Sequence, residues 1–167
     1  MKYLCITFYL LSGFIYFIDA ESFASPIHKS LYNALFCKND SLETVRELEK
    51  QKGNLKKYGI TYHSIGEDMD EVITIRLKKP ITIHGFKTYV VKADFSSGVI
   101  VYGEFQGNYK SAIKKLKLKK GKTVGGVEPV AKYVNIPASK DSCPPTVGLE
   151  PKGKNKFILG CGWCNGG

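Results

Sequence analysis

The spacing of apolar residues changes along the chain, and each change predicts a different kind of secondary structure. Early in the chain, apolar residues recur every three or four positions, as in amphipathic helices. Ser25 offers an N-cap with Pro26 at the first helical position, and Asp40 precedes a second helix with Glu43 three residues later. We therefore expect two short helices, the second ending near Gly53, and each with one apolar face to bury.

In the middle of the chain the pattern changes to short segments rich in β-branched residues, separated by polar or proline-containing breaks. Because the connections between these segments are short, an antiparallel meander is favoured over a parallel sheet, which needs long crossovers. The segments predict strands at 59–65, 71–77, 81–84, 86–95 and 98–105.

After Asn108 the segment 109–120 predicts a third, lysine-rich helix, and the chain then becomes rich in glycine and proline. We expect two of the later strand segments to pair as a hairpin across the loop 151–155, so that Glu150 faces Lys156. The order of helices, meander, helix and hairpin predicts a single α+β domain. The expected strand segments of this last part are 131–136, 146–150 and 156–160.

The first twenty residues have the pattern of a secretory signal. Lys2 is followed by an apolar run from Tyr3 to Ile18 and then by Asp19 and Ala20. The run is 16 residues long, and a membrane-spanning helix needs about 20. We therefore expect cleavage after Ala20, with a retained membrane anchor as the alternative. The domain would then comprise residues 21–167, and the protein would be periplasmic or secreted.

Four cysteines remain after such a cleavage, and an even number in an exported protein indicates two disulfides. The predicted hairpin places Cys143 opposite the segment that contains the last two cysteines. Either of those could bridge to Cys143, and the other could then pair with the cysteine near the first helix. Which cysteine pairs with which stays open among Cys37, Cys143, Cys161 and Cys164.

The spacing of Cys161 and Cys164 also matches the Cys-x-x-Cys of thiol–disulfide oxidoreductases and one half of a zinc site. Only three residues follow Cys164 in this sequence, so we expect no helix there to lower the pKa of a thiol. Cys37 and Cys143 are too far apart to form the second pair of a zinc motif. We expect structural disulfides, no metal and no other cofactor.

Positive charge is concentrated in one segment of the chain. The formal net charge is +10 at pH 7, and seven lysines lie between residues 110 and 122 with no acidic residue among them. The only tryptophan, Trp163, is a candidate aromatic anchor for a partner, or else packs over a disulfide, and Tyr102 and Tyr109 are further candidate anchors. The lysines that we expect to meet a partner are Lys110, Lys114, Lys115, Lys117, Lys119 and Lys120.

Such a lysine segment would attract an acidic protein partner or an anionic surface of the cell envelope. Nucleic acid is disfavoured because the segment has no arginine for bidentate base contacts and only Tyr109 as a neighbouring aromatic residue. Acidic residues are concentrated instead in "GEDMDE" (66–71). We expect a polar turn there rather than a calcium loop, because the spaced ligands of such a loop are missing.

No catalytic motif is recognisable in the sequence. His28, His63 and His84 are scattered, and no His-x-x-x-His, Gly-x-Ser-x-Gly or glycine-rich phosphate loop occurs. The segment 79–107 and the ending "GCGWCNG" are similar to small exported proteins of Gram-negative bacteria that have no assigned activity. This resemblance implies a periplasmic location and provides no catalytic residues.

The sequence therefore favours a non-enzymatic protein that binds another macromolecule, as inhibitors and immunity proteins bind toxic enzymes. Two other functions stay open. One is thiol–disulfide exchange through Cys161 and Cys164, and the other is binding to anionic envelope surfaces through the lysine segment 110–122.

Overall fold

The computed structural model describes residues 25–67, 70–95, 100–140 and 143–163. The expected signal at 1–20 and Cys164 lie outside these ranges. The described part combines helices with an eight-stranded antiparallel sheet, so the α+β class is confirmed. Its helices are α1 (Pro26–Leu35), α2 (Ser41–Lys50), α3 (Lys52–Leu55), the 3-10 helix η1 (Lys56–Tyr58) and α4 (Tyr109–Lys115).

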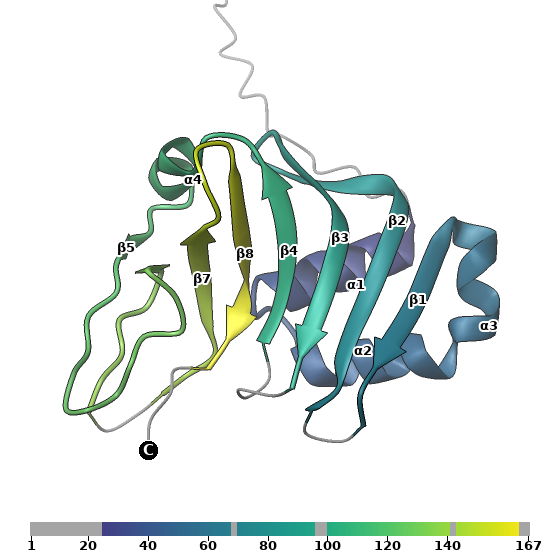
Figure 1. Ribbon diagram of the computed structural model, residues 1–167, viewed down its shortest axis with the longest axis horizontal. Coiled ribbons are helices and arrows are strands. Elements are labelled where there is room, and N and C mark those ends of the chain that lie inside the picture. Colours follow the sequence, from purple (N-terminus) through teal and green to yellow (C-terminus); the bar gives the residue numbers. More distant parts are fainter. Residues whose placement is uncertain (1–24, 68–69, 96–99, 141–142, 164–167) are drawn as a thin grey trace, which may run out of the picture.

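The strands follow one another around the sheet in two meanders that meet in the middle (Figure 1). Their order is β1-β2-β3-β4-β8-β7-β6-β5, and every pair is antiparallel. The last strand therefore pairs with β4 at the junction of the two meanders. The strands are β1 (Ile60–Ile65), β2 (Val72–Ile83), β3 (Phe86–Asp94), β4 (Ile100–Gln106), β5 (Lys119–Lys120), β6 (Tyr133–Val134), β7 (Thr146–Pro151) and β8 (Lys156–Gly162).

Helices α1 and α2 lie behind the sheet in the view of Figure 1, and α1 packs against α2, β4 and β8. Alternate strand residues face these helices, which accounts for the alternation of buried and more exposed positions along β2. The core between the two layers is closed to solvent. Its largest fully buried side chains include Leu31 and Leu35 of α1, Val45 of α2, and Phe105, Phe157 and Leu159 of the sheet.

Side chains cap both long helices at their N-termini. The Ser25 hydroxyl accepts from the backbone N–H of His28, and the Asp40 carboxylate accepts from that of Glu43 at 2.8 Å. The expected stop at Gly53 is wrong, because Gly53 lies inside α3 and the chain stays helical through η1. The turn into β1 comes at Gly59, whose φ of 69° suits glycine.

Strand β2 includes Pro80, which the sequence analysis placed in a break between two strands. The expected strands 71–77 and 81–84 are in fact one strand, with an irregular register between Arg76 and Ile81 where Pro80 lies. A bulge tolerates proline because no ladder hydrogen bond is lost there. Helix α1 stabilises this bulge, since the Nε2 of buried His28 donates to the carbonyl of Lys79 at 3.0 Å.

The expected helix 109–120 is too long. Helix α4 ends at Lys115, and Lys117 has a left-handed backbone with φ 54°. The backbone N–H of Leu118 then bonds back to the carbonyl of Ile113, and that of Lys117 to Lys114, as in a Schellman motif. This turn buries Leu118, which a continued helix would direct elsewhere.

The hairpin of β7 and β8 forms, but its register differs from the predicted one. Glu150 pairs with Ile158 instead of Lys156, because the pairing extends into the predicted loop, as far as Pro151 and Phe157. The difference is two residues along the strand. Since side chains alternate with a period of two, every residue keeps its predicted face.

A disulfide ties the helical layer to the middle of the sheet. Cys37, just after α1, is bonded to Cys161 of β8 across 124 residues of sequence. On the chain-entropy estimate such a loop is worth up to about 5 kcal/mol. This pairing confirms that Cys37 binds one of the two C-terminal cysteines. Cys143 is disulfide-bonded as well.

Candidate binding face of the sheet

The two faces of the sheet have different surroundings. Helices α1 and α2 cover one face, and in the described part of the chain no helix covers the other (Figure 1). We call this second side the open face. Because residues paired across antiparallel strands share a face, the register places its side chains in rows.

The first row of the open face is basic. Lys87 of β3 pairs with Gln106 of β4, and Gln106 pairs with Lys156 of β8. Lys152, which follows β7, donates its backbone N–H to the carbonyl of Lys156 at 2.9 Å. We call Lys87, Lys152 and Lys156 the lysine row. All three are exposed, and each lines the same groove.

The next row is shaped by a bulge in β3. The register changes between Thr88 and Val91, so that both Tyr89 and Val90 lie opposite Glu104. The Thr88 hydroxyl donates to the carbonyl of Val90 at 2.8 Å and stabilises this bulge. Consequently Tyr89 and Val90 both line the groove, and Tyr89 keeps 49% of its surface exposed.

The groove has a volume of about 480 Å³, within the range of ligand pockets. Its floor carries an ion pair between Lys92 Nζ and Glu104 Oε1 at 2.7 Å. The hydrogen bond to Glu104 raises the pKa of Lys92, and burial raises the pKa of Tyr102. At neutral pH, Lys92 is therefore a cation and Tyr102 a neutral phenol. Because Lys92 and Glu104 neutralise each other, the net positive charge of the groove comes from the lysine row.

A smaller hollow of about 220 Å³ adjoins the groove over β7 and β8, and shares Tyr102 and Ile158 with it. The floor contains glycine because the segment between β5 and β6 approaches closely. A Cβ at Gly148 would lie 2.8 Å from the Cβ of Ala131. The remaining lining residues include two acids, Asp94 and Glu150, and the carboxylate of Glu150 accepts from the backbone N–H of Lys132 at 2.9 Å.

The lysines predicted from the sequence are exposed but do not form one helix face. Helix α4 carries Lys110, Lys114 and Lys115, Lys117 follows it, and Lys119 and Lys120 lie on β5. Because α4 ends before Lys117, Lys110, Lys114 and Lys117 do not lie along one helix. Lys115 is held by the sheet, since its Nζ donates to the carbonyl of His84 at 2.8 Å.

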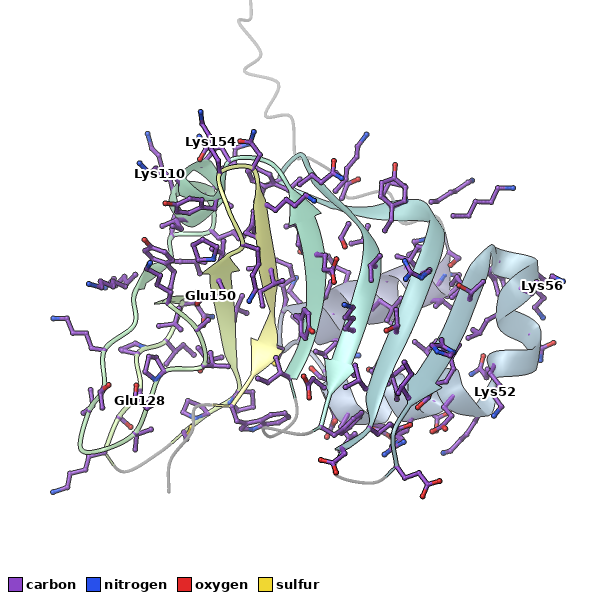
Figure 2. The ribbon with its side chains drawn as sticks, viewed as in Figure 1. Lys52, Lys56, Lys110, Glu128, Glu150 and Lys154 are labelled. Carbon is purple, nitrogen blue, oxygen red and sulfur yellow. A yellow bond between two sulfur atoms is a disulfide. The ribbon has the colours of Figure 1, made fainter. Side chains whose placement is uncertain are left out.

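One of these lysines lies close to the groove. Lys110 lines a shallow hollow together with Lys154 of the β7–β8 loop, which lies between Lys152 and Lys156 in sequence. Figure 2 shows both side chains at the same end of the sheet, with Glu150 further along β7. Trp163 is half-buried and follows the other end of β8. The structure therefore brings Lys110 near the lysine row and leaves Trp163 apart from it.

The acidic segment 66–71 contributes to an ion-pair network. Glu71 is 7% exposed, and it binds Arg46 of α2 at 2.8 Å and the hydroxyl of Ser64 at 2.7 Å. Burial raises the pKa of neighbouring Tyr62 to about 12, and the charges of Glu49 and Glu71 add to this. In the described part of the chain no group of three potential metal ligands occurs. The network joins α2 to β1 and β2.

The histidines lie in separate places. His28 is buried, and its Nδ1 forms a 2.8 Å hydrogen bond with the Ser25 hydroxyl. This serine–histidine pair belongs to the helix cap, because the other ring nitrogen is engaged by the carbonyl of Lys79. His63 is exposed on β1, and His84 lies in the turn between β2 and β3 with φ 47°.

Of the residues that line the groove, only Tyr102 was a candidate anchor from the sequence. Polar residues and tyrosines alternate with buried residues in much of Lys87–Lys92 and again in Tyr102–Gln106, which is the available signal of an open face. What the sequence does not show is that β8 pairs with β4, which brings Lys156 and Ile158 beside them.

Comparison with protein-family models, curated proteins and solved structures gives no match. The resemblance to exported bacterial proteins therefore stays a prediction. Across the described residues, the helices are too short and too polar to cross a membrane.

Proposed function

We propose that this chain is a non-enzymatic, exported binding protein whose open face holds an acidic protein partner, in the manner of an inhibitor or immunity protein. The observation that carries the proposal is the groove between β3, β4 and β8, with the lysine row at its end and Tyr89 and Tyr102 along it. Tyrosine is enriched in interfaces, and lysine supplies long-range attraction to acidic partners.

The scaffold beneath the groove suits binding without rearrangement. Strand β8 forms part of the groove through Ile158, and three residues further Cys161 is bonded to Cys37. A preorganised surface loses less conformational entropy when its partner binds. The helical layer and the disulfide-tied hairpin together would hold the lysine row in a fixed register.

Thiol–disulfide exchange through Cys161 and Cys164 receives no support from the surroundings of Cys161. Its sulfur is bonded to Cys37, and the residue is 1% exposed. An attacking thiolate has to be free and accessible. A reducing partner would first need to reach a buried bond between α1 and the central strands.

Charge reversal separates this proposal from non-specific attraction. The wild-type domain, K87E/K156E and K52E/K56E would each be immobilised and exposed to a periplasmic extract of the source organism. Both variants change the net charge equally, and Lys52 and Lys56 lie on α3 and η1 at the far edge of the sheet (Figure 2). We expect K87E/K156E alone to lose the captured protein. Equal capture by both variants would contradict the proposal.

Anionic envelope surfaces are the second candidate partner. All seven lysines between residues 110 and 122 are exposed, so they are available to lipid headgroups. The test is sedimentation with vesicles of mixed neutral and anionic phospholipid. Retention that K114E/K117E abolishes and K87E/K156E leaves unchanged would support this candidate. Lack of retention would refute it.

A further inference from the structure

We propose that a second surface of this chain, at the end of the sheet beyond the lysine row, docks on anionic phospholipid and leaves the groove free for its partner. We call this surface the basic tip and define it by four exposed lysines, Lys110, Lys114, Lys115 and Lys154. This docking adds a membrane surface to the acidic protein partner. It rests on the lipid-binding candidate of the proposed function, and narrows it from the whole lysine segment to one end of the molecule.

Three connections of the chain are tied together at this end of the sheet. The backbone N–H of Gly107, just before α4, donates to the carbonyl of Asn155 in the β7–β8 loop at 2.9 Å. Lys115 of α4 donates to the carbonyl of His84 in the β2–β3 turn at 2.8 Å. The lysines of the basic tip therefore share one surface although they come from distant parts of the chain, and the two that Figure 2 labels lie together.

No carboxylate offsets the positive charge of the basic tip. In the described part of the chain none of its lysines forms an ion pair. Glu104 and Glu150 follow on the open face beyond the lysine row, and both have partners, Lys92 for the first and the backbone N–H of Lys132 for the second. The segments that form this end contain seven lysines and no acidic residue. They are 84–87, 106–116 and 151–156.

The basic tip includes a hollow suited to a phosphate group. Lys110 and Lys154 line it, and its volume is about 440 Å³. Asn108 also lines it, and because its Oδ1 accepts from the backbone N–H of Lys110 at 2.9 Å, its amide nitrogen is left as a donor. A Cβ at Gly153 would meet nothing within 4 Å, so the loop backbone is open there. Ammonium and amide donors are the groups that bind phosphate oxygens.

The composition of the basic tip favours a lipid surface over a second acidic protein. Its cations are all lysines, which act as flexible point charges, whereas arginine has the rigid fork that matches a fixed carboxylate. Protein interfaces depend on aromatic anchors, but the aromatic residue of this hollow, Tyr109, is half-buried and packs on Tyr133 with ring centroids 6.4 Å apart. Each lysine near an anionic membrane contributes about fivefold in affinity.

The test is sedimentation of the purified protein with vesicles of equal parts phosphatidylglycerol and phosphatidylcholine. K110E/K154E reverses the two lysines of the hollow. K119E/K122E is the matched control, because it changes the net charge equally and Lys119 pairs through Val134 with Gly148, in the middle of β7. We expect K110E/K154E to bind about 20-fold more weakly than the wild type or worse, and the control less than about threefold more weakly. Phosphatidylcholine alone should retain none of them.

The orientation on the membrane supplies a second readout. Trp163 is the only tryptophan, and it lies seven residues beyond Lys156, which is about 23 Å along an extended strand at about 3.3 Å per residue. Nitroxide groups on lipid headgroups quench tryptophan fluorescence at short range. On vesicles that carry them, Trp163 should stay unquenched, whereas the tryptophan of Y109W/W163F, at the basic tip, should be quenched. Circular dichroism would verify that each variant is folded.

Several outcomes would overturn the inference. Equal losses from K110E/K154E and K119E/K122E would show that net charge alone decides binding. An equal loss from K87E/K156E would place the headgroups in the groove, and quenching of Trp163 as strong as that at position 109 would contradict the orientation. Lack of binding by the wild type would refute lipid docking altogether. Capture of the acidic partner is tested separately in an extract without vesicles, so the two proposals fail separately.

Discussion

The covered and open faces of the same strands perform different tasks, and β8 shows the difference residue by residue. On the covered face, Phe157, Leu159 and Cys161 are buried, and Cys161 is bonded to α1 through Cys37. On the open face, Lys156 and Ile158 line the groove. Neighbouring residues can therefore differ completely in what their replacement affects. Covered-face substitutions should change stability, and open-face substitutions should change binding.

The largest effect is expected from truncating a covered-face aromatic residue. Phe157 is 1% exposed, stacks on Phe105 with centroids 5.5 Å apart and meets Phe86 edge-on. Phe157→Ala should lower the free energy of unfolding by about 3–5 kcal/mol in urea titrations. The next residue on the open face is the matched control. Ile158→Ala should cost about 1 kcal/mol or less, since it is only half-buried. Similar losses for both variants would contradict the division between the faces.

Removing the disulfide should be the next largest perturbation. The double variant C37A/C161A leaves Cys143 unchanged and releases α1 from β8. We expect it to lose about 2–5 kcal/mol of stability because the unfolded chain is no longer constrained. Below its unfolding transition it should keep its affinity for a partner, since the groove residues are untouched. Loss of binding by a fully folded double variant would contradict this, because it would show that partner binding requires the disulfide.

A smaller effect concerns alkaline pH and the network at the edge of the covered face. The pKa of Tyr62 is raised from 10.0 to about 12, so the folded state holds its phenolic proton more tightly than the unfolded state does. The stabilisation is complete below pH 10 and is lost as the pH rises toward 12. Between pH 9 and 11 the stability of Tyr62→Phe should therefore fall less than that of the wild type. Parallel curves of unfolding free energy against pH for the two proteins would contradict this.

The smallest expected effect is on the open face. Replacing Lys92 by Met removes the ion pair with Glu104, and both side chains are partly exposed. We expect a change in unfolding free energy of less than about 1 kcal/mol. Binding of a short acidic peptide (EEELVGEE) should weaken because Glu104 is left uncompensated in the groove. A decrease in unfolding free energy as large as that of Phe157→Ala would contradict this, because it would show that the open face also contributes strongly to stability.

The class of fold could be predicted from the sequence because its signals are local. Ser25 and Asp40 mark helix starts, and strand alternation needs only a few residues to be recognised. The errors arose where a distant contact decides the outcome. Helix α4 stops early because Leu118 turns into the core, and Pro80 is tolerated because His28 binds the bulge beside it.

The candidate site was harder to predict than the fold. The high density of lysines favoured the segment 110–122 as the predicted binding site. The groove is instead lined by residues from Lys87 to Ile158, which are far apart in sequence. Two structural features create it. One is the bulge at Tyr89 and Val90, and the other is the pairing of β8 with β4. Neither has a signal in composition or local periodicity.

The most direct test of the open face as the recognition surface is its mapping by NMR. Uniformly ¹⁵N-labelled domain would be titrated with a short acidic peptide (EEELVGEE), and amide shifts would be followed residue by residue. We predict the largest changes in β3, β4 and β8 around Tyr89, Glu104 and Ile158, with α3 unaffected. Changes confined to the lysine segment 110–122, with the groove amides unmoved, would contradict the account.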